Sequence, residues 1–338
     1  MGKPQVSMGD VVASYLARRR RAVANQRLSP GMARSDEVTL GQLCRYWKGR
    51  SAATLDSQAL EEFFDQLRDS GNGPATINRK VSQVRVFHRW AVQRGLLQPT
   101  MCEDLTLDTV PEKDRRRLRW DQLRRVYEEA PDPYERWAMA LAVHTAGRDG
   151  ELCSRRVADV DLQRQRIRWE SHKTKRLDWR PFTQELDTEV RSWFLAYQSS
   201  CGPLQDDWYL IPRRMYSPGG GWDWQPARER FDVKDITKRR LAAVLGVTPK
   251  SLRGEGTHTL RRSAARCLFD WLVEDEEQDF ATALEVVRNW LQHSNVAITA
   301  HYIGVDRFRL ERDAALSGRS FLSRDGGNVV KLRRTSGT

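Results

Sequence analysis

The stretch Thr257-His258-Thr259-Leu260-Arg261-Arg262 decides the fold of this chain, together with one segment before it and one after it. The first is Thr145-Ala146-Gly147-Arg148, which follows a long apolar run; the second is Gln292-His293-Ser294, with Tyr302 nine positions after the histidine. The order is therefore arginine, His-x-x-Arg, histidine and tyrosine. Guanidinium groups match pairs of phosphate oxygens, and a phenol oxygen can attack phosphorus. The pattern predicts a site that holds a phosphodiester between cations while the tyrosine attacks it.

Each side chain suits one task in such a reaction. Arg148 and Arg261 would clamp the two non-bridging oxygens and neutralise the charge that develops there. His258 titrates near neutral pH and could accept or share the tyrosine proton. His293 would donate a hydrogen bond to the phosphate, and Tyr302 would form a covalent phosphotyrosine. Each motif alone is a weak signal, but their joint order and spacing are specific.

On these motifs the chain resembles the tyrosine recombinase (phage integrase) family across nearly its whole length. The resemblance implies cleavage that leaves a 3′-phosphotyrosyl link and a free 5′-hydroxyl, with no metal and no cofactor. It also implies a general acid, a lysine on a β-hairpin between the first arginine and the His-x-x-Arg motif. That position falls at Lys173, with Lys175 as the competitor two residues away. Glu151 matches an acidic residue that orients the first arginine in this family.

The sequence departs from the family pattern at two places. Gln292 stands where the family usually has glycine before the second histidine. The interval between Arg261 and His293 is longer than usual and contains the acidic run Glu274-Asp275-Glu276-Glu277. We expect this run to lengthen a loop between two helices, which would affect loop geometry and assembly more than cleavage.

The charge balance predicts a polyanionic partner. With 57 Lys+Arg against 45 Asp+Glu the chain carries a net charge of +12, and its pI is near 9.8. The five cysteines are scattered and never spaced as Cys-x-x-Cys, which argues against a disulfide framework or a zinc site. No apolar run approaches the roughly 20 residues that span a bilayer, and no signal peptide is recognisable. We expect a cytoplasmic protein associated with the nucleoid.

The length of 338 residues fits two domains. After a tail at 1–8, residues 9–105 show helical periodicity and predict a four-helix, SAM-like core-binding domain. Four candidate DNA-binding cations project from the more polar side of its last helix: Arg79, Lys80, Arg85 and Arg89. A small helical domain with solvated arginines fits this segment alone equally well. The charged segment 106–119 predicts an exposed linker, and it holds three further DNA-binding candidates, Arg115, Arg116 and Arg117.

Residues 120–318 are predicted to form the catalytic domain, followed by a polar tail at 319–338. The apolar residues from Trp137 to Val143 lie nearly all round one helix, which should therefore be buried. Two alternating runs, Arg166–Glu170 and Leu177–Phe182, predict a β-hairpin around the candidate lysine. Tyr216–Trp224 is expected to be a loop of unassigned role. Phe308–Leu316 is expected to form a last helix that either docks on a neighbouring protomer, as the family implies, or packs back on its own domain.

The predicted fold is mainly α with a small β-sheet (α+β), in which the two domains close on DNA as a C-shaped clamp. Only about eight residues precede the first helix, which indicates the simple two-domain type without an arm-binding domain. The resemblance implies a double-stranded recombination site as partner, a homotetramer on DNA, and a monomer or weak oligomer off DNA. It also implies an accessory directionality factor.

Other functions fit parts of the same pattern. A type IB topoisomerase or a telomere resolvase shares the Arg/Lys/Arg/His/Tyr site, but a topoisomerase needs no second DNA site. A DNA-binding regulator that kept the fold without catalysis would have no use for Tyr302. Among recombinases, an integrase of a phage or mobile element and a host or plasmid resolvase stay open, as do the target sequence and the overlap length.

Overall fold

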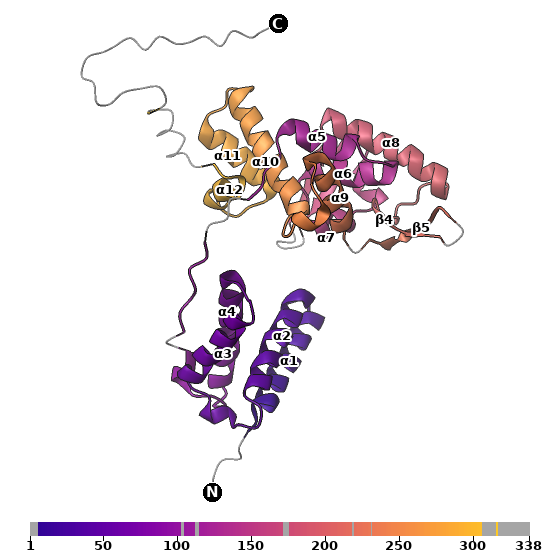
Figure 1. Cartoon of the computed structure of the whole chain (residues 1–338). Helices are drawn as coiled ribbons and strands as arrows, with labels where there is room; N and C mark the ends of the chain where they lie inside the picture. Colours follow the sequence, from indigo (N-terminus) through magenta and orange to yellow (C-terminus); the bar gives the residue numbers. More distant parts are fainter. Residues whose placement is uncertain are drawn as a thin grey trace, which may run out of the picture. The chain divides into compact units, whose positions relative to one another are not determined.

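The computed structural model describes residues 6–102, 105–111, 115–171, 176–217, 220–230, 232–305 and 316. The chain divides into two compact units, Met1–Lys113 and Asp114–Thr338, each of which is described by itself (Figure 1). The described residues are mostly helical, with two small antiparallel sheets in the second unit, which confirms the predicted fold class. Within those residues, no helix is long and apolar enough to cross a bilayer.

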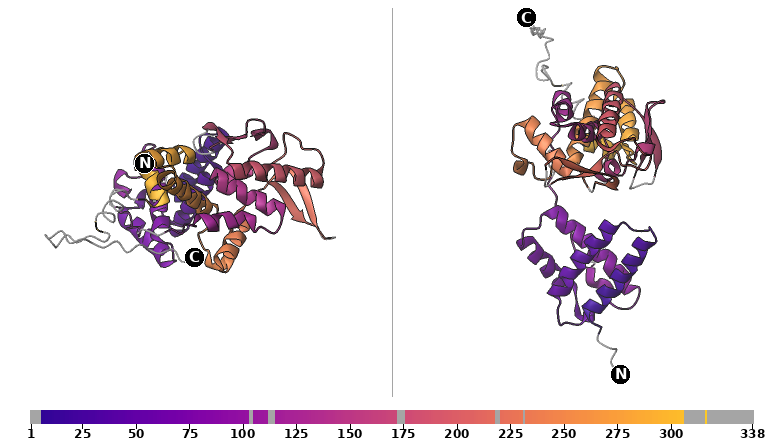
Figure 2. Two further views of the ribbon diagram at one scale, coloured as in Figure 1. Left: turned by 90° about the horizontal axis from the view of Figure 1, so that it is seen from above. Right: turned by 90° about the vertical axis from the view of Figure 1, so that its right-hand side faces the viewer.

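The first unit is a bundle of four helices around an aromatic-rich core. The helices are α1 (Met8–Ala24), α2 (Pro30–Tyr46), α3 (Ser57–Asp69) and α4 (Pro74–Val92), with 3-10 turns at Ala52–Thr54 and Pro99–Cys102. The side chain of Asp56 caps α3 by accepting a hydrogen bond from the Ala59 amide. In the core, the ring of Tyr15 meets those of Phe87 and Trp90 edge to face. The right-hand view of Figure 2 shows the four helices gathered in one group.

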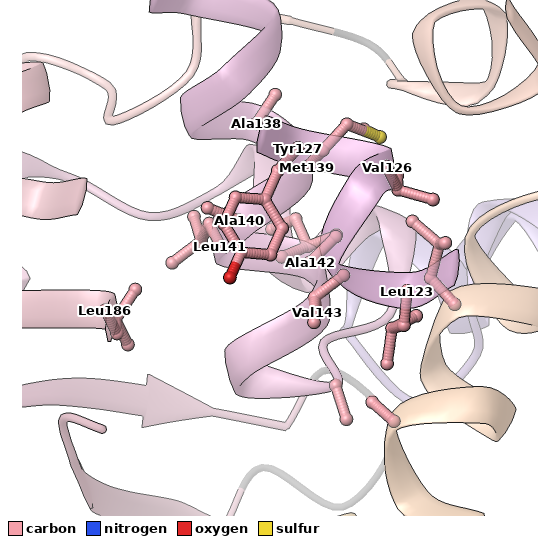
Figure 3. Close-up of a cluster of buried hydrophobic side chains, with 14 of the residues drawn as sticks. Leu123, Val126, Tyr127, Ala138, Met139, Ala140, Leu141, Ala142, Val143 and Leu186 are labelled. Atoms are coloured by element: carbon pink, nitrogen blue, oxygen red, sulfur yellow. The ribbon is translucent and has the colours of Figure 1, made fainter. Parts of the chain in front are cut away.

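The second unit is built around α6, a helix buried nearly all round, as its apolar residues predict. Its helices are α5 (Trp120–Glu128), α6 (Pro133–Thr145), α7 (Asp149–Cys153), α8 (Gln184–Cys201), α9 (Lys234–Leu245), α10 (Thr257–Glu274), α11 (Phe280–Leu291) and α12 (Val296–Ile303), with 3-10 turns at Val157–Asp159 and Pro249–Ser251. Figure 3 shows α6 side chains from Ala138 to Val143 clustered with Leu123 and Tyr127 of α5. Because α6 is packed on nearly all sides, its C-terminal end, which leads to Arg148, has a well-defined position.

The predicted β-hairpin is present as part of a three-stranded antiparallel sheet. The strands are β1 (Val160–Asp161), β2 (Arg166–Glu170) and β3 (Leu177–Pro181), in the order β1-β2-β3. Ile167 lies directly opposite Arg180, and residues opposite each other share a face of the sheet. Arg180 is accordingly buried on the same side as Ile167, whereas Leu177 and Trp179 are exposed. Strand β3 thus buries Arg180 and leaves its large apolar residues exposed.

A second hairpin corrects the loop expected at 216–224. Strands β4 (Pro212–Tyr216) and β5 (Trp222–Glu229) pair in antiparallel fashion, with Tyr216 opposite Trp222 and Arg214 opposite Trp224. The guanidinium carbon of Arg214 lies 4.1 Å from the ring centroid of Trp222. These cross-strand aromatic and cation–π pairs stabilise the two strands. The glycines between the strands had made the whole stretch resemble a loop in the sequence. Figure 1 shows the hairpin at one edge of the unit, next to α8.

The end of the predicted linker is packed on the second unit. The Leu118 amide donates to Oγ of Ser263 at 2.9 Å, and the Arg262 guanidinium donates to the Arg116 carbonyl at 2.7 Å. Leu118 is itself buried. These residues therefore belong to the second unit and not to an exposed connection. The expected helix Phe308–Leu316 lies outside the described residues apart from Leu316.

Candidate active site

Arg148 occupies the N-cap position of α7, directly after the bend that follows α6. Its backbone N–H donates to Oε2 of Glu151 at 3.0 Å, and its Nη1 donates to Oε1 at 2.8 Å. Burial by itself would raise the pKa of the Glu151 carboxyl, but the Arg148 N–H groups and the nearby arginine charges bring the pKa below its ordinary value. The buried carboxylate therefore stays ionised and holds the Arg148 guanidinium, which is still 27% exposed.

Arg261 lies in the second turn of α10 and is 1% exposed. Its Nη1 donates to the carbonyl of Ala146 and its Nη2 to the carbonyl of Leu291, at 2.6 Å for the latter. Both acceptors stand at helix ends, where carbonyls lack partners within the helix. A guanidinium has five N–H donors, so at most three are left for a phosphate. Burial and the charge of Arg148 lower the pKa of Arg261 to about 10, which keeps it cationic at neutral pH.

Trp169 of β2 packs against the bend between α6 and α7. A Cβ at Gly147 would lie 2.5 Å from a ring carbon of this tryptophan, so the close approach requires glycine. The indole N–H of Trp169 points to Oε2 of Glu151 at 3.4 Å. The guanidinium carbon of Arg180 lies 4.6 Å from the centroid of the same ring. The bend that presents Arg148 is thus enclosed by side chains of β2 and β3.

His258 precedes Arg261 by three residues, so the two side chains share a face at the start of α10. His258 is exposed, yet neighbouring protein atoms displace part of the water around its ring. This partial burial, together with the charges of Arg261 and Arg148, lowers the pKa of the imidazole below its ordinary value. The ring is therefore neutral at physiological pH and able to accept a proton.

Tyr302 lies in the last turn of α12, half-buried, with its hydroxyl directed at the start of α10. The hydroxyl donates to the main-chain carbonyl of His258 at 3.2 Å. Burial raises the pKa of the phenol, although the charges of Arg261 and Arg262 oppose that rise. The phenol consequently keeps its proton at neutral pH, and a nucleophilic attack would require a base beside it.

The bend between α11 and α12 presents His293 to Tyr302. The two rings stand perpendicular, with centroids 5.3 Å apart, and Nδ1 of His293 lies 3.1 Å from Oγ1 of the buried Thr299. Just before this histidine, Gln292 ends α11 in the left-handed conformation, with φ 54° and ψ 42°. Glycine adopts this conformation without strain, which explains physically why it suits position 292. The two polar atoms of the Gln292 amide are buried without a hydrogen-bond partner within the described residues.

Five of the six predicted catalytic residues are described, and the structure brings them together from four helix ends. They are Arg148, His258, Arg261, His293 and Tyr302. Fixed guanidinium groups can hold an anion here, a neutral imidazole can take a proton, and a protonated phenol can give one up. The sixth, Lys173, and its competitor Lys175 fall in the sequence between β2 and β3, outside the described residues.

The predicted DNA-binding residues of α4 divide into two kinds. Arg79 and Arg89 are exposed, as their place on the polar side of the helix requires. Lys80 is a correction: it is 4% exposed, and its ammonium donates to the side chain of Gln42 inside the bundle. Lys80 follows the buried Ile77 by three residues, so it lies on the core side of α4. Burial lowers its pKa.

The remaining DNA-binding candidates also differ in exposure. Arg85 is half-buried and donates to the carbonyl of Leu105 within the first unit. Arg115 and Arg116 are exposed, whereas Arg117 is half-buried with its guanidinium against Gly304 at the end of α12. Arg115 and Arg116 therefore have the exposure that a phosphate contact needs.

Four further residues support the site and were not singled out from the sequence: Gly147, Trp169, Arg180 and Thr299. Gly147 and Thr299 stand close in sequence to a predicted catalytic residue, which was an available signal. Nothing in the local pattern of β2 or β3 indicates that Trp169 or Arg180 faces the bend before Arg148.

Comparison with known sequences points to one family. The model of the phage integrase family matches residues 116–308, and that of the phage integrase N-terminal SAM-like domain matches residues 22–95. Tyrosine recombinase XerC of Mycobacterium sp. (strain KMS) is 25% identical over 278 residues, which cover 79% of this chain and 85% of that protein. XerC of Mycobacterium tuberculosis (strain ATCC 25177 / H37Ra) is 26% identical over 279 residues, covering 79% and 86%.

Solved structures of the same family share the fold. A lambda integrase tetramer bound to a Holliday junction matches with a TM-score of 0.64 at 17% identity, over 96% of this chain and 81% of that one. XerH recombinase in a post-cleavage complex with a palindromic difH substrate matches with a TM-score of 0.62 at 16% identity, over 84% and 79%. Since the phage integrase model spans more than half of the sequence, the chain belongs to the phage integrase family and is a tyrosine recombinase.

Proposed function

We propose that this chain is a site-specific recombinase that cleaves and rejoins double-stranded DNA through a 3′-phosphotyrosyl intermediate at Tyr302. The observation that carries this proposal is the position of the Tyr302 hydroxyl. It lies 3.2 Å from the carbonyl of His258, with His293 perpendicular to its ring. A protein that only bound DNA would have no need for a protonated phenol held beside the charges of Arg261 and Arg148.

The proposed reaction assigns one task to each group. Arg148 and Arg261 bind the two non-bridging oxygens of the scissile phosphate and stabilise the charge of the transition state. His258 removes the proton from Tyr302 as the phenol oxygen attacks phosphorus. His293 donates a hydrogen bond to the phosphate.

Lys173 completes the proposed step as the general acid. As the bond from phosphorus to the tyrosine oxygen forms, the bond to the 5′-oxygen breaks, and Lys173 protonates that leaving oxygen. The covalent link conserves the phosphodiester for rejoining, because the 5′-hydroxyl of another strand can displace the tyrosine. Arginine charge takes the place of a metal ion throughout.

The related structures guide the proposed assembly. The lambda integrase match is a tetramer on a Holliday junction, and XerH is bound to its difH site. We infer that the two units of this chain close on a duplex as a C-shaped clamp, with Arg79, Arg89, Arg115 and Arg116 on its phosphates. Four protomers would assemble on DNA from monomers or weak oligomers, with the segment 308–316 contacting a neighbour. An accessory directionality factor and association with the nucleoid complete the proposal.

A suicide-substrate experiment tests this function. The Tyr302→Phe chain selects a binding site from a random duplex library, and the enriched sequence, called here the site duplex, is nicked at successive positions. The wild-type chain should form a covalent adduct on one nicked form in excess EDTA, whereas Tyr302→Phe should bind the site duplex and form none. An adduct formed by the Tyr302→Phe chain, or cleavage that needs magnesium, would contradict the mechanism. Strand exchange between two site duplexes distinguishes a recombinase from a topoisomerase, which relaxes supercoils without a second site.

A further inference from the structure

Arg180 of β3 is a buried cation that none of the proposed steps uses. It is 4% exposed, and its Nε is buried without a hydrogen-bond partner among the residues described. Burial and the charge of Arg261 lower its pKa to about 9, so it remains mostly cationic at neutral pH. An apolar side chain of similar volume is often at least as stable at such a position as a buried charge. Fold stability therefore does not account for an arginine here.

The contacts of Arg180 lead first to the backbone before Arg148. Its Nη1 donates to the carbonyl of Thr145, while Nη1 of Arg261 donates to the next carbonyl, that of Ala146. Two guanidinium groups thus hold two successive peptide planes at the end of α6. Only Gly147 separates these planes from Arg148, and Trp169 leaves it no space for a side chain. The direction in which the chain enters Arg148 is fixed by these bonds.

A second set of contacts links Arg180 to the Arg148 guanidinium through side chains. Arg180 stacks on the ring of Trp169, and the indole N–H of Trp169 points to Oε2 of Glu151. The other carboxylate oxygen of Glu151 accepts the hydrogen bond from Nη1 of Arg148. The contacts of Arg180 among the described residues therefore lead to both the backbone before Arg148 and, through Trp169 and Glu151, its guanidinium.

We propose that Arg180 is a positioning residue that fixes Arg148 for the scissile phosphate. The inference rests on the proposed function, in which Arg148 binds a non-bridging oxygen. Charge stabilisation in a transition state depends on donors that are already in place, because reorienting them would add to the barrier. The guanidinium of Arg180, from β3, holds the carbonyl of Thr145, and Arg261, from α10, holds that of Ala146.

The first test uses the full chain and the nicked site duplex at saturating DNA. Arg180→Met should form the covalent adduct about 100-fold more slowly, since a displacement of about 1 Å in a reacting group has an effect of this size. Its dissociation constant for the intact site duplex should stay within about twofold, and its Tm within about 3 °C of the wild type. Arg180→Lys, which keeps a charge and a donor, should recover part of the rate.

Arg166→Met provides the matched control. Arg166 lies on the neighbouring strand β2 and also stacks on a tryptophan, with its guanidinium carbon 4.2 Å from the centroid of Trp179. It is one residue from the inward Ile167, however, and so faces the opposite side of the sheet. The control should cleave at the wild-type rate. A slow Arg166→Met would show that any disturbance of this sheet impairs the site, and the inference would fail.

A double substitution separates positioning from direct action. If Arg180 acts through Arg148, then Arg180→Met should slow the Arg148→Ala chain by less than about threefold, because nothing is left to position. A full additional loss in that background would place Arg180 at the phosphate itself and overturn the inference. So would a wild-type rate for Arg180→Met, or a fall in Tm large enough to explain the lost activity.

A spectroscopic measurement keeps the test independent of cleavage. The Nε–H resonance of Arg148, assigned by its absence in Arg148→Ala, should shift and broaden in Arg180→Met and stay unchanged in Arg166→Met. An unaltered resonance in both variants would refute positioning even if the chain formed no adduct. Absence of any wild-type adduct would refute the proposed function instead, so the two failures are distinguishable.

Discussion

Two bends of the second unit, one after α6 and one after α11, have the same local shape but different support. Each ends a helix with a non-glycine residue in the left-handed conformation, Ala146 at φ 45° and Gln292 at φ 54°. Each then presents a side chain of the candidate site, Arg148 in the first and His293 in the second. The first bend is enclosed by Trp169, whereas at the second the buried amide of Gln292 has no partner among the described residues.

The difference between the bends matches the tasks proposed for Arg148 and His293. A cation that must stabilise developing charge needs an orientation fixed in advance, which backbone bonds and a buried carboxylate supply. A histidine that donates one hydrogen bond needs only its ring oriented, and Thr299 supplies that contact. Arg261 joins the two bends, because it donates to the carbonyl of Ala146 in one and of Leu291 in the other.

The largest expected effect comes from removing the side chain that the first bend presents. Arg148→Ala should slow adduct formation by about 10³-fold, as loss of a donor to a developing oxyanion does. A 5′-bridging sulfur should not restore the rate, because the variant lacks phosphate charge stabilisation and not leaving-group protonation.

Lys173→Ala should be slow on normal DNA and largely restored by the sulfur, since a thiolate leaves without a proton.

The sulfur substrate also decides between the two lysines of the β2–β3 connection. Single-turnover rates on paired oxygen and sulfur duplexes provide the measurement. Selective rescue of Lys175→Ala, with Lys173→Ala behaving as wild type, would move the general acid by two residues. Rescue of Arg148→Ala by the sulfur would mean that Arg148 assists departure of the 5′-oxygen, and the proposed difference between the two bends would be wrong.

At the second bend, the contact that orients His293 should contribute less. Thr299→Val removes the hydroxyl beside Nδ1 while keeping the shape of the buried side chain. We expect adduct formation about tenfold slower, which corresponds to about 1.4 kcal/mol, near the value of one oriented hydrogen bond. Thr299→Ser is the control and should retain most of the rate. A loss as large as that of Arg148→Ala would show that both bends are equally critical.

The Gln292 amide, which has no hydrogen-bond partner among the described residues, predicts that the second bend can be made more stable. Gln292→Gly removes both the buried amide and the left-handed strain, and together these changes should stabilise by about 1 kcal/mol or more. For a unit of this size the Tm should rise by about 2–4 °C per kcal/mol. Gly304→Ala is the control and should lower the Tm. The Arg117 guanidinium occupies the space that its Cβ would need, and its φ of 69° disfavours alanine. A lower Tm for Gln292→Gly would mean that the amide has a favourable contact.

The smallest expected effect concerns the pH profile of His258, which lies between the two bends. Its pKa is lowered, so the neutral base persists to lower pH, and activity should be lost as pH falls below the ordinary pKa of histidine. Arg115→Gln removes one of the cations responsible, so the pKa should rise and the acid limb of the rate profile should move to higher pH. High salt should weaken the difference. An identical limb in both chains would exclude Arg115 as a contributor.

The order of motifs was sufficient to select the candidate side chains that the structure brings together, because Arg148, Arg261 and Tyr302 each carry chemistry that few alternatives provide. The class of fold followed from helical periodicity, and buried α6 from its apolar residues. Local pattern could not reveal Arg180, since alternation along β3 would bury Leu177 and Trp179 instead. Only the pairing with β2 turns Arg180 inward. That pairing joins two separate segments, and the hydrophobic pattern of neither segment alone specifies their register.

The anchoring of Leu118 on α10 determines where this protein can be divided. The sequence predicts that the catalytic domain starts at Trp120, which makes that residue an attractive start for an isolated fragment. Such a fragment would lack Leu118, which is 3% exposed, and would deprive the Arg262 guanidinium of the Arg116 carbonyl. A fragment that begins at Asp114 keeps both contacts. The boundary between the two units thus lies before Arg115–Arg117, and a domain exchange should keep these arginines with the second unit.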